Sequence, residues 1–230
     1  MNYQKNINGK LALGYGSKYQ LLRMLGWHRN ELNNVLSQCL NVDRNINWLD
    51  FGFAGPCDKE LLNLDFIPEL KNSWRDYWMC GGANGGINWD AVGISSDGTY
   101  ILVEAKAHLK EVDSSASSKS DSKTKNNQKI DLFLQKYKIN SSANIWSANF
   151  YQFANRLVIT DYMLSKGYKV KLVYLLFENG YEYNCARPDS ASRAEWEAKM
   201  DQELVDTGVK GTEAEKLVNV CVVNCNRKQK

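Results

Sequence analysis

Several features that define common protein classes are missing from this sequence of 230 residues. No stretch approaches the roughly 20 consecutive apolar residues that a membrane-spanning helix needs, which argues against a membrane protein. The first five residues are too polar to form the apolar core of a secretory signal. We therefore expect a cytoplasmic protein.

Cysteine spacing typical of a disulfide framework or a zinc ribbon is also missing, because none of the six cysteines forms a CxxC pair. We expect reduced thiols and no structural zinc. Cys221 and Cys225 lie in and beside the apolar segment 217–223. Free cysteine is commonly buried, so these two are interpreted as small core residues of a strand.

Strong charge of either sign is absent, since the formal net charge is only +3. Such a charge permits a polyanionic partner without requiring one. Its distribution is uneven, because eight lysines stand against four acidic residues between Lys106 and Lys138. Residues 113–129 within that segment have almost no apolar side chains, so we expect a mobile insertion there. Its lysines are expected to attract backbone phosphates non-specifically.

No internal repeat is visible, and the 43% apolar content is sufficient for one full-sized core. We expect a single domain over residues 1–230, with its core at about 17–177. Apolar periodicity and turn residues predict these elements in chain order: helices at 17–26 and 29–40, strands at 45–54, 87–94 and 99–107, helices at 130–137 and 149–166, a strand at 170–177, a helix at 192–204 and a strand at 217–223. This order predicts an α/β fold with a mixed central sheet flanked by helices.

Two segments are harder to interpret. In residues 57–80, closely spaced leucines favour a helix that Pro68 would break. The glycine-rich run 81–86 is interpreted as a flexible connection. A nucleotide-binding role is a remote alternative, because the run lacks the lysine and hydroxyl of a P-loop and leads into a strand.

Two carboxylates and a lysine stand on the predicted hairpin of residues 87–107. Glu104 and Lys106 project from one face because side chains alternate along a strand. Whether Asp90 joins them depends on register. A two-residue loop would pair Asp90 with Ala105, whereas a three-residue loop ending at Gly98 would pair it with Glu104. Gly98 suits the left-handed position of the longer loop, which favours the second geometry.

Convergent carboxylates are what the hydrolysis of a phosphodiester requires, because a divalent cation must neutralise the phosphate and help to generate hydroxide. Mg²⁺ keeps several waters and takes one or two protein carboxylates. Packing gives no reason for an apolar strand to end in Glu-Ala-Lys, since buried charges are costly unless they are paired. The alternative is a Glu104–Lys106 ion pair at a solvent-exposed strand end.

Asn88-Trp89-Asp90, a turn, and the segment from Tyr100 to Lys106 together resemble the signature of the PD-(D/E)xK, or restriction-endonuclease-like, superfamily. The core of that superfamily is αβββαβ, and the order predicted for residues 17–177 is similar to it, with a helix and a strand added at the C-terminal side. The resemblance implies that Mg²⁺ or Mn²⁺ binds to Asp90, Glu104 and the Ala105 carbonyl, and that Lys106 positions or activates water. No proline precedes Asp90, a departure that many members share.

Further residues are weaker candidates. Some members of the superfamily add a carboxylate from the first helix, and here that position is unsettled, with Glu31 in the second helix. Exonuclease-type members carry a glutamine on the helix after the motif, a place that Gln152 fits. Arg156 follows one turn on, so this helix could present polar groups to a phosphate. An ordinary polar helix edge is the alternative. His108 continues the face of Lys106, but a lone histidine at a strand end is more often incidental.

We therefore expect a metal-dependent nuclease that hydrolyses nucleic acid, with DNA ahead of RNA. The expected catalytic residues are Asp90, Glu104, Lys106 and Gln152. The residues expected to contact nucleic acid are Lys110, Lys119, Lys123, Lys125, Lys129 and Arg156. A homodimer is a candidate assembly, and no membrane partner is expected. The alternative function is an inactive nucleic-acid-binding module that keeps the nuclease fold.

Overall fold

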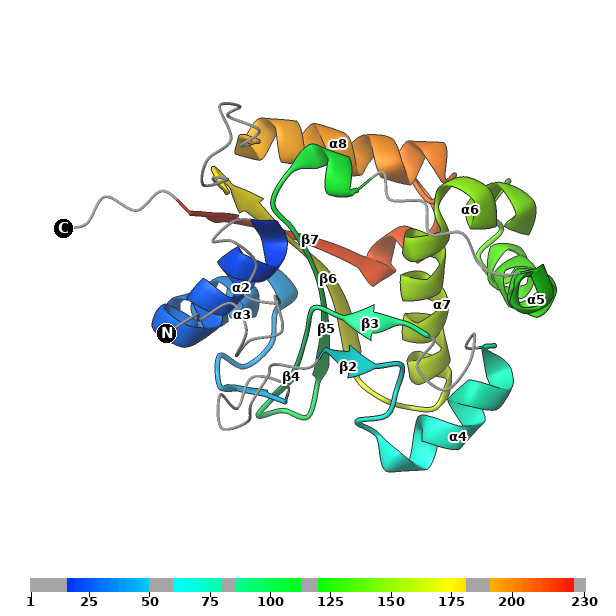
Figure 1. The fold of residues 1–230 in the computed structure, drawn as a ribbon, viewed down its shortest axis with the longest axis horizontal. Helices are drawn as coiled ribbons and strands as arrows, with labels where there is room; N and C mark the ends of the chain where they lie inside the picture. The colour runs from blue at the N-terminus through cyan, green and yellow to red at the C-terminus, as the bar shows by residue number, and fades with distance from the viewer. Residues whose placement is uncertain (1–15, 50–59, 80–85, 113–119, 181–190, 226–230) are drawn as a thin grey trace, which may run out of the picture.

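A mixed five-stranded sheet crosses the middle of the molecule in the computed structural model, which describes residues 16–49, 60–79, 86–112, 120–180 and 191–225 (Figure 1). The strand order is β1 (Ile46–Trp48), β4 (Ala91–Ser95), β5 (Tyr100–Lys106), β6 (Val170–Glu178) and β7 (Val218–Asn224). Strands β1, β4 and β5 are antiparallel neighbours, whereas β5, β6 and β7 run parallel. The α/β class with a mixed sheet is therefore confirmed.

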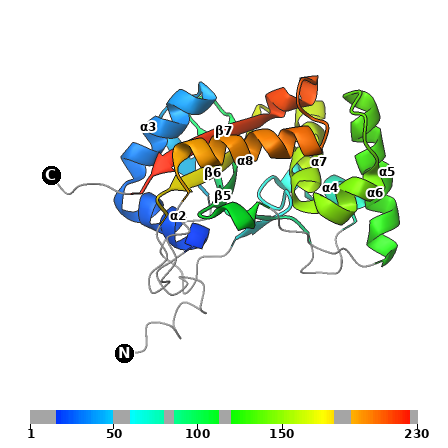
Figure 2. The same ribbon diagram turned by 90° about the horizontal axis from the view of Figure 1, so that it is seen from above.

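Helices cover both faces of this sheet (Figures 1 and 2). On one face lie α2 (Gly16–Trp27) and α3 (Arg29–Leu40), which pack against alternate residues of β5, Val103 and Ala105 among them. On the other face lie α7 (Tyr151–Ser165) and α8 (Arg193–Asp206), in one apolar cluster with Leu102 of β5. The alternation of β5 therefore directs Glu104 and Lys106 toward the α7 face.

The hairpin between β4 and β5 has the register that the three-residue loop predicts. Ala91 pairs with Val103, and Ile94 pairs with Tyr100. Gly98 has a φ of +82°, the left-handed conformation expected at that position. Continued by one residue, this register sets Asp90 opposite Glu104, so the geometry that the sequence favours is confirmed.

Residues 60–79 differ from the expected broken helix. Leu61 and Leu62 form a short strand, β2 (Leu61–Leu62), which pairs with β3 (Asn88–Trp89). Pro68 does not break a helix; it begins α4 (Pro68–Tyr77). Proline fits the first position of a helix because its missing N–H would have had no partner there. Of the strand expected at 45–54, β1 covers 46–48, and residues 50–54 lie outside the described part, as does the glycine run apart from Gly86.

The Ser/Lys-rich tract also differs from its prediction. Helix α5 (Ser120–Lys136) begins ten residues before the expected helix, so at least residues 120–129 are helical where a mobile insertion was predicted. The side chain of Asn126 is fully buried and bonds both the N–H and the carbonyl of Met79. Tertiary hydrogen bonds of this kind compensate for the poor apolar content of the tract. Residues 113–119 lie outside the described ranges.

The remaining elements lie close to their predicted places. The helix expected at 149–166 is α7, and Gly167 follows it with a φ of +84°. A further helix that was not predicted, α6 (Ala143–Asn149), precedes it. Short 3₁₀ turns are η1 (Leu109–Glu111) and η2 (Glu213–Leu217). Cys221 and Cys225 are buried free thiols, as predicted. In the described ranges, no helix is long and apolar enough to cross a membrane.

Candidate active site

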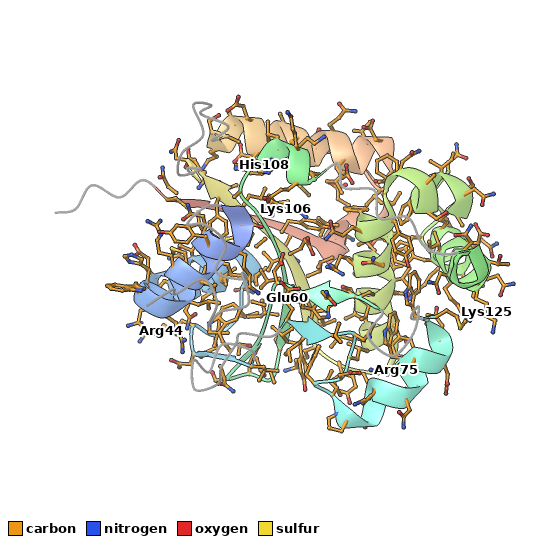
Figure 3. All side chains as sticks on the ribbon, viewed as in Figure 1. Arg44, Glu60, Arg75, Lys106, His108 and Lys125 are labelled. Carbon is orange, nitrogen blue, oxygen red and sulfur yellow. The ribbon has the colours of Figure 1, made fainter. Side chains whose placement is uncertain are left out.

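The candidate site lies at the end of β5, beyond the point where β4 stops pairing with it. Asp90 directly precedes β4, and its Oδ2 accepts a hydrogen bond from the backbone N–H of Ala105 at 2.7 Å. The Asp90 carboxylate thus accepts the hydrogen bond that a backbone carbonyl would accept if β4 continued to pair with β5. Lys106 lies near the middle of the molecule in Figure 3, and His108 lies beyond it toward α8.

Glu104 is the centre of a buried polar network and is only 1% exposed. Its Oε1 lies 2.7 Å from Lys106 Nζ and accepts a hydrogen bond of 2.7 Å from Gln152 Nε2. Its Oε2 lies 2.7 Å from both Nε and Nη2 of Arg156. Lys106 Nζ also donates to Gln152 Oε1 at 3.1 Å. The structure therefore brings together Glu104, Lys106 and Gln152, three of the four predicted catalytic residues, and Asp90 adjoins them through Ala105.

Arg156 belongs to this interior network. It is 4% exposed, and its Nη2 donates to the carbonyl of Asn88 at 2.6 Å. Its guanidinium lies 4.5 Å from the ring centre of Trp89, a cation–π contact. Arg156 was expected to contact nucleic acid, but in this geometry its cation faces Glu104 and the protein interior.

The interpretation of Glu104 and Lys106 as a pair at a solvent-exposed strand end is wrong, because Lys106 is only 7% exposed. Burial opposes ionisation of Glu104, yet the charges and hydrogen bonds of Arg156 and Lys106 outweigh it and lower the pKa of this carboxyl. Glu104 is therefore ionised and paired with two cations inside the protein. Sequence reasoning missed this arrangement because Arg156 is 52 residues away in the chain.

Asp90 has the opposite electrostatic character. Burial, and then the negative charge of Glu104, raise the pKa of Asp90 from 3.8 to about 7. The hydrogen bond from Ala105 and the charges of Arg156 and Lys106 act in the other direction but do not cancel the rise. Two neighbouring carboxyls thus differ in protonation near neutral pH, a pattern that is more frequent at functional sites than elsewhere.

The oxygen donors available for a cation are the carboxylates of Asp90 and Glu104 and the carbonyl of Ala105, which are hard ligands of the type that Mg²⁺ prefers. A carboxylate has about four lone-pair directions, and four nitrogen contacts already occupy those of Glu104. Binding of a cation by Glu104 therefore requires Lys106, Gln152 or Arg156 to give up a contact with one of its oxygens. Within the described ranges, no group of three or more His, Cys, Asp or Glu side chains is arranged to hold a metal ion.

Two weaker candidates lie outside the Glu104 network. Glu31 belongs to α3 and pairs with His28 at 3.5 Å. Because α3 packs on the face of the sheet opposite to the Glu104 side chain, Glu31 adds no carboxylate to the site. His108 Nε2 lies 3.4 Å from Glu111 Oε1, and Glu111 Oε2 accepts from the Ala107 N–H at 2.7 Å. Glu111 was not among the predicted residues, because nothing in the local sequence pattern indicates its contact with Ala107.

The lysines expected to bind nucleic acid do not form one surface in the described structure. Lys110 is exposed on η1, four residues after Lys106. Lys125 is exposed on α5, at the outer edge of the molecule (Figure 3). Lys129 is half-buried, with its Nζ 4.4 Å from the ring centre of Tyr77. Lys119 and the side chain of Lys123 lie outside the described part.

Nothing matched the chain among protein-family models, curated proteins or solved structures.

Proposed function

We propose that this chain is a metal-dependent nuclease of the PD-(D/E)xK superfamily that hydrolyses DNA. The observation that carries the proposal is the placement of Asp90 against the Glu104–Ala105 segment, with Lys106 and Gln152 converging on Glu104. The elements α3, β1, β4, β5, α7 and β6 also support it, because they follow the order of the αβββαβ core of that superfamily, with β2, α4 and β3 inserted after β1 and with α5 and α6 inserted before α7.

The proposed division of labour follows from the side chains. Asp90, Glu104 and the Ala105 carbonyl would hold Mg²⁺ or Mn²⁺, which when bound supplies charge neutralisation and an activated water. Lys106 would orient the attacking water and balance the negative charge that develops on the phosphate. Gln152 contacts both Glu104 and Lys106, so it fixes their relative positions.

A second candidate is a nucleic-acid-binding module that keeps the fold and lacks turnover. One observation favours it: both oxygens of Glu104 are already engaged by Lys106, Gln152 and Arg156. If those contacts persist with a cation present, the carboxylate contributes to stability rather than to catalysis. The two candidates therefore differ in whether divalent cation reaches Glu104.

A cleavage assay separates them. The purified full chain is incubated with labelled linear, circular and single-stranded DNA and with RNA, in Mg²⁺, in Mn²⁺ and in chelator. We expect DNA cleavage only with cation present, and none by Asp90→Asn, which keeps the size of the side chain but loses its charge. The matched control is Glu197→Gln, because Glu197 is an exposed carboxylate of α8. Binding in chelator without cleavage of any substrate in either metal would favour the inactive module.

A further inference from the structure

A small pocket adjoins Lys106 and is lined in part by Tyr174, the residue of β6 that pairs with Glu104. Its polar lining consists of Lys106, Gln152, Tyr174 and Glu203, and its other lining residues are apolar. The centre of a water-sized sphere can move within about 10 Å³ of this pocket. That volume is close to the space that one water molecule needs. Strands β5 and β6 and helices α7 and α8 all contribute residues to this lining.

Tyr174 brings a polar atom to this pocket. It is 4% exposed, and its hydroxyl has no hydrogen-bond partner among the described residues. An unpartnered buried hydroxyl costs about 1–3 kcal/mol, so such groups in folded proteins are usually bonded to protein or to ordered water. Tyr174 lies on β6 directly beside Glu104 of β5 and brings a hydroxyl into the otherwise apolar run 172–177.

Lys106 has hydrogen-bonding capacity left at the same place. An ammonium group carries three donors. Within the described part of the chain, its nitrogen contacts two acceptors, Glu104 Oε1 and Gln152 Oε1. One N–H therefore remains to be satisfied, and Lys106 and Tyr174 line the same pocket.

Glu203 supplies negative charge to the pocket from α8. It is 6% exposed. Lys106 lines the same pocket, so a basic and an acidic residue both border it. A water between them would accept from the lysine and donate to the carboxylate, which are the donor and acceptor roles that a bridging water fills.

We infer that the pocket binds one water molecule that joins Lys106 to Tyr174 and Glu203, and that Tyr174 and Glu203 thereby position Lys106. The water site rests on the pocket and its unsatisfied donors. The catalytic consequence rests on the proposed nuclease function of Lys106. Tyr174 and Glu203 are thus positioning residues, which act on the substrate only through the lysine.

Two measurements on the full chain test this inference. A crystal structure at a resolution that shows ordered waters should contain a water within hydrogen-bond distance of Lys106 Nζ, the Tyr174 hydroxyl and the Glu203 carboxylate. Tyr174→Phe should lose or displace this water. In the DNA-cleavage assay, Tyr174→Phe and Glu203→Gln should each lower kcat about tenfold, the scale of one hydrogen bond to a charged group, with KM unchanged.

Matched controls exclude a general effect of the substitutions. Tyr168→Phe removes a hydroxyl that bonds Glu69, and Glu197→Gln removes an exposed charge of α8, so both should keep the parent kcat. A dry pocket in the parent structure would overturn the inference, and so would an unchanged kcat in both Tyr174→Phe and Glu203→Gln. If the parent cuts no nucleic acid but holds the water, the water site stands and the nuclease proposal fails.

Discussion

Asp90 caps the backbone of Ala105 with a 2.7 Å hydrogen bond at the point where β4 stops pairing with β5. The cap holds one carboxyl beside the buried carboxylate of Glu104, whose charge, after burial itself, raises the pKa of Asp90 to about 7. The ionised carboxylates of Asp90 and Glu104 therefore repel each other, and binding of a cation or a proton reduces this repulsion. Both ligands have measurable consequences.

Asp90→Asn should stabilise the protein at high pH. The folded-state pKa of about 7 lies above the ordinary 3.8, so the folded protein binds this proton more tightly than the unfolded chain does. Parent stability should therefore fall as pH rises from about 4 to about 7. A rise of the pKa from 3.8 to about 7 corresponds to a loss of at most roughly 4 kcal/mol from the parent's free energy of unfolding. The Asp90→Asn variant avoids this loss because an amide does not ionise. Urea unfolding at pH 5 and pH 8 measures the difference.

The matched control for that experiment is Asp76→Asn, because Asp76 is an exposed residue of α4. It should show the same pH dependence as the parent. An Asp90→Asn protein whose stability falls with pH as steeply as that of the parent would contradict the raised pKa.

Cation binding should weaken as pH falls through about 7. Protonated Asp90 cannot act as an anionic ligand, so the apparent affinity for Mn²⁺ should drop about tenfold between pH 8 and pH 6. Isothermal titration calorimetry of the full chain at the two pH values measures this change. Equal affinities would mean that Asp90 is not a ligand.

Arg156→Lys should destabilise the protein by about 2 kcal/mol, although it conserves charge. An ammonium cannot reproduce the paired contacts of Nε and Nη2 with Glu104 Oε2 or the stacking on Trp89. Thermal or urea unfolding measures the loss, with Arg44→Lys at an exposed position as control. Stability equal to that of the parent would show that the buried network contributes little to the fold.

Much of the architecture follows from local sequence pattern. Alternation along residues 99–107 identified the faces of β5, and Gly98 fixed the loop length and hence the register that sets Asp90 against Glu104. These features depend on neighbours in the chain and on one glycine conformation. A single sequence is sufficient for such predictions because the period of a strand admits only two faces.

Features that depend on distant contacts were not predictable in this way. Leu61 and Leu62 adopt a strand because β3 pairs with them, and the helix from Ser120 depends on Asn126 bonding to Met79. The burial of Glu104 depends on how closely α7 packs against β5. The resemblance to exonuclease-type members of the superfamily pointed to Gln152 on that helix, but it carries no information on the distance from Arg156 to Glu104.

If Lys110 and Lys125 contact nucleic acid, they should contribute to the salt dependence of DNA affinity. Replacing Lys110 and Lys125 by Gln should weaken DNA binding and reduce the slope of log affinity against log salt by about one for each lysine that contacts a phosphate. Binding in chelator across a series of salt concentrations measures the slope. The control is Lys216→Gln, an exposed lysine of η2 that pairs with Glu213. An unchanged slope would exclude both lysines from the contact surface.

Substitution of Lys106 should affect catalysis and leave folding intact. Lys106→Met should abolish cation-dependent cleavage, because it removes the ammonium that orients water and balances charge on the phosphate. The variant should remain folded, since Met fills a similar volume and Glu104 keeps its two contacts with Arg156. Unfolding and cleavage are measured on the same preparation.

Lys106→Met should lose activity without losing affinity for a divalent cation. Lys106 Nζ lies 2.7 Å from Glu104 Oε1, so it competes with a cation for that oxygen, and its removal should leave Mn²⁺ binding as tight as in the parent or tighter. Asp90→Ala should instead weaken Mn²⁺ binding, because it removes a ligand. If Lys106→Met cuts DNA at the parent rate, Lys106 is structural, and the Glu-Ala-Lys segment at the end of β5 has no part in catalysis.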